Sequence, residues 1–261
     1  MLLTPQQLLD NWNEHLNYVN LFSDDRKEKV LDFYKKYQDR LVILPASHKK
    51  EYHNAFPGGY IEHVNRVIKQ SIALYRLWSD AGCDVSGFSK EELIFSAMFH
   101  DLGKLGDENH DSYIPQDDKW RRDNLGEQYK FNTKLAFASV PDRGLYLLQS
   151  HDIKYSFNEM VTIQIHDGLY DEANKKYLMT YMPEQKPRTC LPFIVHQADM
   201  LAARFEFERE WGKKLLSKEE KNHVDNKGKG STIKGNSKPS NKAKALNTVG
   251  SSKLLNSLNN L

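Results

Sequence analysis

The chain of 261 residues has little cysteine and no long apolar run, and both features restrict the classes of protein to which it can belong. Two cysteines, Cys83 and Cys190, are too few for the disulfide framework of a small secreted domain. No stretch approaches the roughly 18 consecutive apolar residues of a membrane-spanning helix. The N-terminus also lacks the basic and apolar segments of a signal peptide. We therefore predict reduced thiols and an intracellular, cytoplasmic protein.

Regular alternation of apolar and polar residues, which is typical of strands, never extends beyond a few residues. Apolar residues at helical spacing are frequent instead, which predicts an all-α fold. Residues 105–130 look like an irregular polar insertion. Start signals and periodicity predict helices from Thr4, Asp25, Gly59, Ser89 and Ser156, another over about 134–149, and a last one from Pro192 to about Lys214.

The net charge of +2 is unevenly distributed along the chain. Residues 222–261 contain seven lysines and one acid, a charge of +6, which leaves −4 for residues 1–221. This segment is rich in Gly, Ser, Asn and Lys and cannot bury enough apolar surface to offset its ordering entropy. We predict a disordered basic tail over 222–261, able to contact nucleic acid nonspecifically. The remainder is predicted to form an N-terminal helical segment, 1–45, packed on a core domain, 46–221.

The dipeptide His100-Asp101 ends an apolar run that reaches from Leu93 to Phe99. A carboxylate at the end of a buried helix is costly unless it is paired or binds a metal. The C-terminal end of the helix dipole also favours a cation at this position. For the dipeptide alone, a capping Asp beside a surface His is the favoured explanation.

Two further residues change the interpretation of this dipeptide. His63 lies on the long predicted helix after Gly59, and Asp199 lies among small and apolar residues of the last predicted helix, where a salt bridge to Arg204 is the alternative. Together the set offers two imidazoles and two carboxylates from three helices. Such mixed nitrogen and oxygen ligands suit Mn²⁺, Fe²⁺ or Mg²⁺ better than structural zinc.

The order His … His-Asp … Asp resembles the signature of the HD superfamily of metal-dependent phosphohydrolases. The segment His100-Asp101-Leu102-Gly103-Lys104 is similar to the family's HDxGK motif. The segment from His53 to His63 resembles the motif H-H-x-F-x-G-G-x-x-x-H of HD-type 3′→5′ exonucleases and relaxase-associated HD domains, with Asn54 in place of the second His. The resemblance covers roughly residues 48–205 and implies an HD-domain helical bundle.

The resemblance implies that one divalent metal, Mn, Fe or Mg, is bound by His63, His100, Asp101 and Asp199. It also implies that Lys104 contacts a substrate phosphate, and that His53 contacts the substrate or a water on the metal. Asp101 or a nearby histidine would accept a proton.

Many members of the superfamily bind a second metal through two additional histidines. His166 resembles the later of these two, but no histidine occupies the expected earlier position near residues 140–143. Asp142, His151 or His110 could take its place, so the number of ions stays open.

These features predict metal-dependent hydrolysis of a phosphoester in a nucleotide or single-stranded nucleic acid by metal-activated water. The resemblance of the segment ending at His63 slightly favours the exonuclease-like branch. Two alternatives stay open: a noncatalytic HD domain that binds a nucleotide or partner protein, and a helical scaffold in which the histidines merely coincide.

Overall fold

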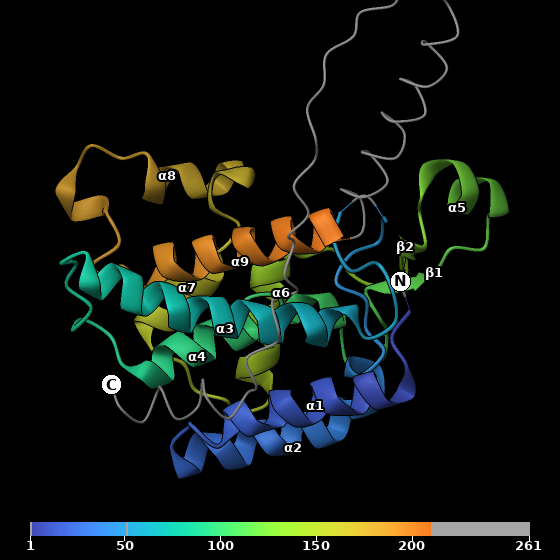
Figure 1. The fold of residues 1–261 in the computed structure, drawn as a ribbon, viewed down its shortest axis with the longest axis horizontal. Coiled ribbons are helices and arrows are strands. Elements are labelled where there is room, and N and C mark those ends of the chain that lie inside the picture. The colour runs from blue at the N-terminus through green and yellow to red at the C-terminus, as the bar shows by residue number, and fades with distance from the viewer. Residues whose placement is uncertain (1, 51, 210–261) are drawn as a thin grey trace, which may run out of the picture. The chain divides into compact units, whose positions relative to one another are not determined.

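The computed structural model describes residues 2–50 and 52–209. A boundary between two units falls after Phe207, and the description below concerns the first unit, which begins at Met1. The tail predicted over 222–261 and the end of the predicted core domain lie outside the described residues. Within the described part the fold is mostly helical, as the sequence predicts, with one small two-stranded sheet (Figure 1).

The N-terminal segment forms two helices, α1 (Pro5–Val19) and α2 (Asp24–Leu41). Thr4 and Gln7 form the predicted capping box in front of α1, with proline at the first helical position. The buried side of α1 contacts α3 (Gly59–Asp80), and His15 of α1 forms hydrogen bonds with Asn65 of α3 and Tyr34 of α2. This segment therefore belongs to the same unit as the residues that follow it.

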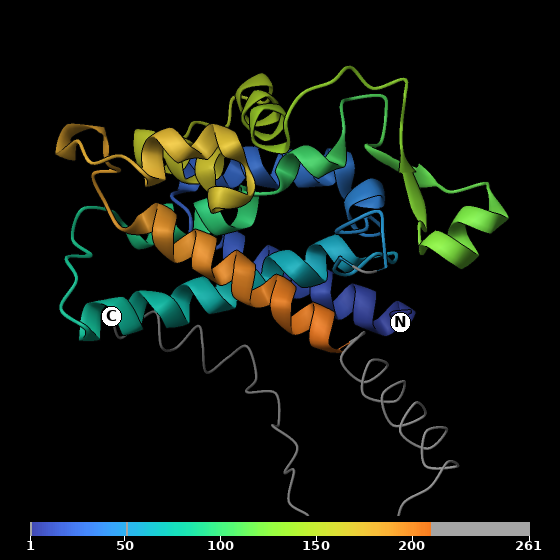
Figure 2. The ribbon, with the colours of Figure 1, turned by 90° about the horizontal axis from the view of Figure 1, so that it is seen from above.

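Four helices build the centre of the unit: α3, α4 (Lys90–Phe99), α7 (Phe157–Ile165) and α9 (Leu191–Phe207). The helices α3 and α9 lie side by side in both views of the fold (Figures 1 and 2). The predicted capping boxes at Ser89 and Ser156 are confirmed at the starts of α4 and α7. Because α4 is buried around its whole circumference, its C-terminal end at His100 lies inside the protein.

The insertion predicted to be irregular contains a hairpin, which corrects that prediction in part. Strand β1 (Tyr113–Pro115) pairs antiparallel with β2 (Tyr129–Phe131), and α5 (Lys119–Leu125) connects them. An isolated bridge between Lys49 and Glu127 joins the insertion to the loop before α3. Strands of three residues are too short to produce a visible alternation, so the sequence pattern did not reveal them.

The helix predicted over 134–149 is shorter at its start: α6 spans Val140–Ser150. Ser139 caps it and Pro141 lies in its first turn, both of which are local start signals. The remaining elements are one short α-helix, α8 (Lys175–Leu178), and short 3₁₀-helices: η1 (Leu102–Leu105), η2 (Gly168–Tyr170), η3 (Glu172–Asn174) and η4 (Pro183–Gln185).

Cys83 and Cys190 are free thiols in the structure. Among the described helices, none combines the length and the apolar character that crossing a membrane requires.

Candidate metal centre

The four residues predicted as metal ligands converge at one point between α3, the end of α4 and α9. His63 Nε2 lies 3.0 Å from Asp199 Oδ1 and 3.7 Å from Asp101 Oδ2. His100 Nε2 lies 3.4 Å from the same oxygen of Asp101 and 3.8 Å from that of Asp199. Octahedral ligands about 2.1 Å from one ion lie roughly 3.0 to 4.2 Å apart, so this spacing matches a shared cation.

The imidazoles of this cluster present their Nε2 atoms to the shared point. His100 Nδ1 donates to the carbonyl of Ala97 at 2.9 Å, so its neutral ring carries the acceptor lone pair on Nε2. The Nε2 atom of His100 is buried and has no hydrogen-bond partner in the structure, and that of His63 faces the Asp199 carboxylate. A buried nitrogen without a partner is costly, and a cation bound by the lone pair of His100 removes that cost. The donor set therefore fits a divalent metal.

Glu206 is a member of the site that the sequence did not indicate. Its side chain is fully buried at the end of α9, where Oε2 accepts from His63 Nδ1 at 3.1 Å and Oε1 accepts from Arg66 Nε at 3.0 Å. A carboxylate on the far nitrogen fixes the orientation of a metal-binding imidazole and raises its basicity. A glutamate 143 residues from His63 has no local signal that would have revealed it.

His166 lies beside the first cluster and extends it. Its Nδ1 donates to the carbonyl of Ile163 at 2.8 Å, and its Nε2 lies 3.5 Å from Asp101 Oδ1 and 3.7 Å from Asp167 Oδ1. Asp101 therefore directs one oxygen toward His63 and His100 and the other toward His166. His166, Asp167 and Asp199 also form a group whose ligand atoms lie within 4.8 Å of one another. This arrangement offers a second cation position, with Asp167 as a ligand that the sequence analysis did not name.

The other residues considered for a second ion do not join the cluster. His151 contacts Leu147 O at 3.0 Å through Nδ1 and the Tyr37 hydroxyl at 3.3 Å through Nε2, so both of its nitrogens have partners. His110 lies 3.2 Å from the carboxylate of Asp107. Asp142 is exposed in the first turn of α6.

Lys104 and His53 both lie at the centre. Lys104 Nζ donates to Asp101 Oδ2 at 2.5 Å, and the ring of His53 lies 4.7 Å from that of His63. His53 Nε2 is buried without a hydrogen-bond partner, and it groups with His63 and Asp101 as a further candidate ligand atom. In this structure the ammonium group of Lys104 neutralises Asp101. If Asp101 bound a cation instead, the Lys104 ammonium would be free to bind a phosphate oxygen.

Charges of the cluster alter the pKa values of its members. Burial lowers the pKa of His63, but the carboxylates of Glu206 and Asp199 outweigh burial and raise it to about 10. Burial likewise opposes the charge on His166, yet Asp101 and Asp167 raise its pKa to about 9. Burial alone would raise the pKa of Asp101, but the charge of Lys104 and the neighbouring imidazoles hold it well below its usual range. The cluster thus binds protons on imidazole and keeps its carboxylates ionised.

The Gly-Gly block before His63 sets the start of α3. Gly58 caps the helix with a φ of 83°, and a Cβ on Gly59 would lie 2.1 Å from the carbonyl oxygen of Asn54. Only glycine permits this close approach of two backbone segments. The loop that carries His53 is thereby held against the first turn of α3, one turn before His63.

A cleft with a volume of about 700 Å³ opens onto the cluster. Its lining includes Asp101 and Asp199 of the centre, Lys104 and His53 beside it, and Tyr52, Tyr170 and His196 farther out. This volume falls within the range of small-molecule sites, roughly 300–1,000 Å³.

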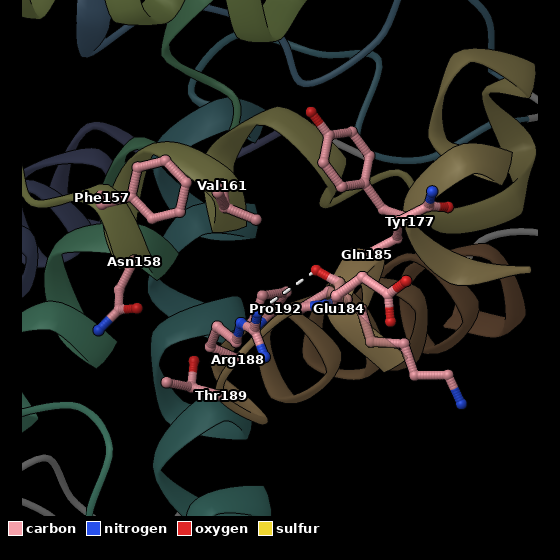
Figure 3. A pocket seen from close by; sticks show the side chains of 11 residues that line it. Phe157, Asn158, Val161, Tyr177, Glu184, Gln185, Arg188, Thr189 and Pro192 are labelled. Carbon is pink, nitrogen blue, oxygen red and sulfur yellow. Dashed lines mark hydrogen bonds between the residues drawn. The ribbon is translucent and has the colours of Figure 1, made fainter. Parts of the chain in front are cut away.

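A second cavity of about 260 Å³ is lined by residues of α7, α8 and the segment before α9, among them Phe157, Tyr177 and Arg188 (Figure 3). None of the predicted site residues lines this cavity. Four of the residues predicted from the sequence, His53, Asp101, Lys104 and Asp199, line the cleft instead.

Comparisons with family models, with curated proteins and with solved structures find no match for this chain. The buried His and Asp groups can hold a metal ion. The resemblance to the HD superfamily stays a prediction from the motifs.

Proposed function

We propose that this protein is a divalent-metal-dependent phosphohydrolase of the HD type, which cleaves a phosphoester in a nucleotide or single-stranded nucleic acid. The observation that carries the proposal is the convergence of His63, His100, Asp101 and Asp199 at the base of an accessible cleft. A divalent ion held there would lower the pKa of a water and neutralise charge on the phosphoryl group.

The residues around this point have separate roles in the proposed reaction. Asp101, Asp199 and the two imidazoles hold the cation, and Glu206 orients one of those imidazoles. Lys104 binds a phosphoryl oxygen, because its ammonium lies beside Asp101 and lines the cleft. His53 contacts the attacking water or the substrate through its unpartnered Nε2.

The test combines metal analysis with an activity screen of the full-length protein. We expect bound transition metal after purification, and manganese-supported release of product from at least one substrate among dNTPs, NTPs, cyclic dinucleotides and single-stranded DNA and RNA. Asp101→Ala removes an oxygen from both cation positions, so we expect loss of metal and of hydrolysis with an unchanged far-UV helical signal. His110→Ala is the matched control, since His110 lies outside the cluster and should retain both properties.

Two results would refute the proposal in different ways. Bound metal without cleavage of any substrate would favour a noncatalytic binding domain. Wild-type protein that binds no divalent metal at all would favour the helical scaffold.

A further inference from the structure

Four rings form a connected group beside the candidate centre, which we call the aromatic strip: Tyr52, His48, Tyr113 and Phe131. The His48 ring lies 5.3 Å from Tyr52, 4.9 Å from Phe131 and 6.3 Å from Tyr113, as measured between ring centroids. Tyr113 and Phe131 are also cross-strand partners in the hairpin, with their rings 5.4 Å apart.

The strip begins at the cleft and ends outside it. Tyr52 lines the cleft, next to His53 in the sequence. Ser112, which precedes Tyr113, donates from its hydroxyl to Gly103 O at 3.2 Å, which holds the start of β1 against the segment that carries Lys104. Phe131 does not line the cleft. A ligand that contacts Phe131 while its phosphate lies at the centre must therefore extend beyond the cleft.

Two of the four rings, Phe131 and Tyr52, are exposed, while His48 and Tyr113 are half-buried. Phe131 is 61% exposed and Tyr52 is 51% exposed, a large apolar area left in contact with water. The backbone of His48 accepts hydrogen bonds from Gln128 N at 3.0 Å and Tyr129 N at 3.2 Å, which fixes the hairpin to the loop. Rings held in place in this way lose little conformational entropy when a ligand stacks on them.

We infer that the aromatic strip binds the unpaired bases of a single-stranded polynucleotide whose phosphate lies at the candidate metal centre. This inference rests on the proposed function and narrows its substrate to a strand rather than a free nucleotide. Bases stack on aromatic side chains irrespective of sequence, and duplex bases are unavailable because they already stack on one another. A cation bound at the centre would, with Lys104, supply the positive charge for the backbone, and the strip supplies the stacking faces.

The test measures binding by the full-length protein of a fluorescein-labelled dT12 with phosphorothioate linkages, which slow cleavage, by fluorescence anisotropy in Mn²⁺. Phe131→Ala removes one stacking face, and we expect about 5- to 150-fold weaker binding. Phe131→Trp keeps a stacking face at this position and should bind dT12 as tightly as the wild type does. Trp120→Ala is the matched control, because Trp120 is also 61% exposed and lies in the same insertion but outside the strip. We expect Trp120→Ala to stay within twofold of wild type.

Binding as tight to the dT12·dA12 duplex, or equal effects of Phe131→Ala and Trp120→Ala, would overturn the inference. Cleavage of thymidine 5′-p-nitrophenyl phosphate by the wild type, measured separately, tests the proposed function independently. If this ester is cleaved but Phe131→Ala binds dT12 like wild type, only the strip inference fails. If binding depends on the strip but no phosphoester is cleaved, the proposed hydrolysis fails, and the strip is a binding site for single strands without a catalytic role.

Discussion

Metal binding at the candidate centre should release a proton from His63. In the metal-free protein the carboxylates of Glu206 and Asp199 hold the pKa of this imidazole at about 10, against the opposing effect of burial. A cation that takes the Nε2 lone pair must displace that proton. At pH 7 the displacement costs about 4 kcal/mol, or 1.36 kcal/mol for each of about three pH units. Because the raised pKa favours the protonated form at lower pH, metal affinity must increase as the pH rises.

We expect the affinity for the first Mn²⁺ ion to rise about tenfold per pH unit between pH 6.5 and 8, where one proton is displaced. Isothermal titration calorimetry of chelator-treated protein in buffers of different ionisation enthalpy counts the protons directly. A second ion at His166 should displace a second proton, because its pKa of about 9 also lies above this range. An affinity that is independent of pH, with no proton released, would refute the assignment of His63 as a ligand.

Three other perturbations have outcomes that follow from the structure. Glu206→Gln removes a carboxylate that raises the pKa of His63, so it should reduce the number of protons released when the metal binds. Glu62→Gln is the control, because Glu62 contacts the same Arg66 but not His63, and it should leave that number unchanged. The calorimetry described above counts the protons for both variants. Burial lowers the pKa of His15 to about 4, so the folded protein keeps this imidazole neutral. The free energy of unfolding that is present above pH 6.5 should therefore fall by about 3 kcal/mol as the pH drops to 4. Urea unfolding of the wild type and of His15→Gln over this pH range measures the difference. Gly168→Ala would place a Cβ 2.2 Å from the His196 ring and should lower the Tm more than Gly82→Ala, where the φ is also positive but nothing lies within 4 Å.

Local signals in the sequence predicted most of the helices. The capping boxes at Thr4, Ser89 and Ser156 lie where the sequence indicates, because such caps join residues only three positions apart. The same locality explains the failure at residues 134–139, where apolar spacing favoured a helix but the chain caps its helix at Ser139. The sequence did not predict the hairpin, because its strands form only by pairing with each other and a helix separates them in the chain.

The sequence by itself determined the chemistry that this protein can offer: which imidazoles and carboxylates are present, and on which helices they lie. Only the tertiary structure decided that His63, His100 and Asp199 share one point, that Glu206 lies behind His63, and that Asp101 also faces His166. Helix periodicity fixes the neighbours of a residue within a few positions along the chain. The contacts that make a metal centre join residues up to about 140 positions apart, and only packing of the buried helix faces brings them together.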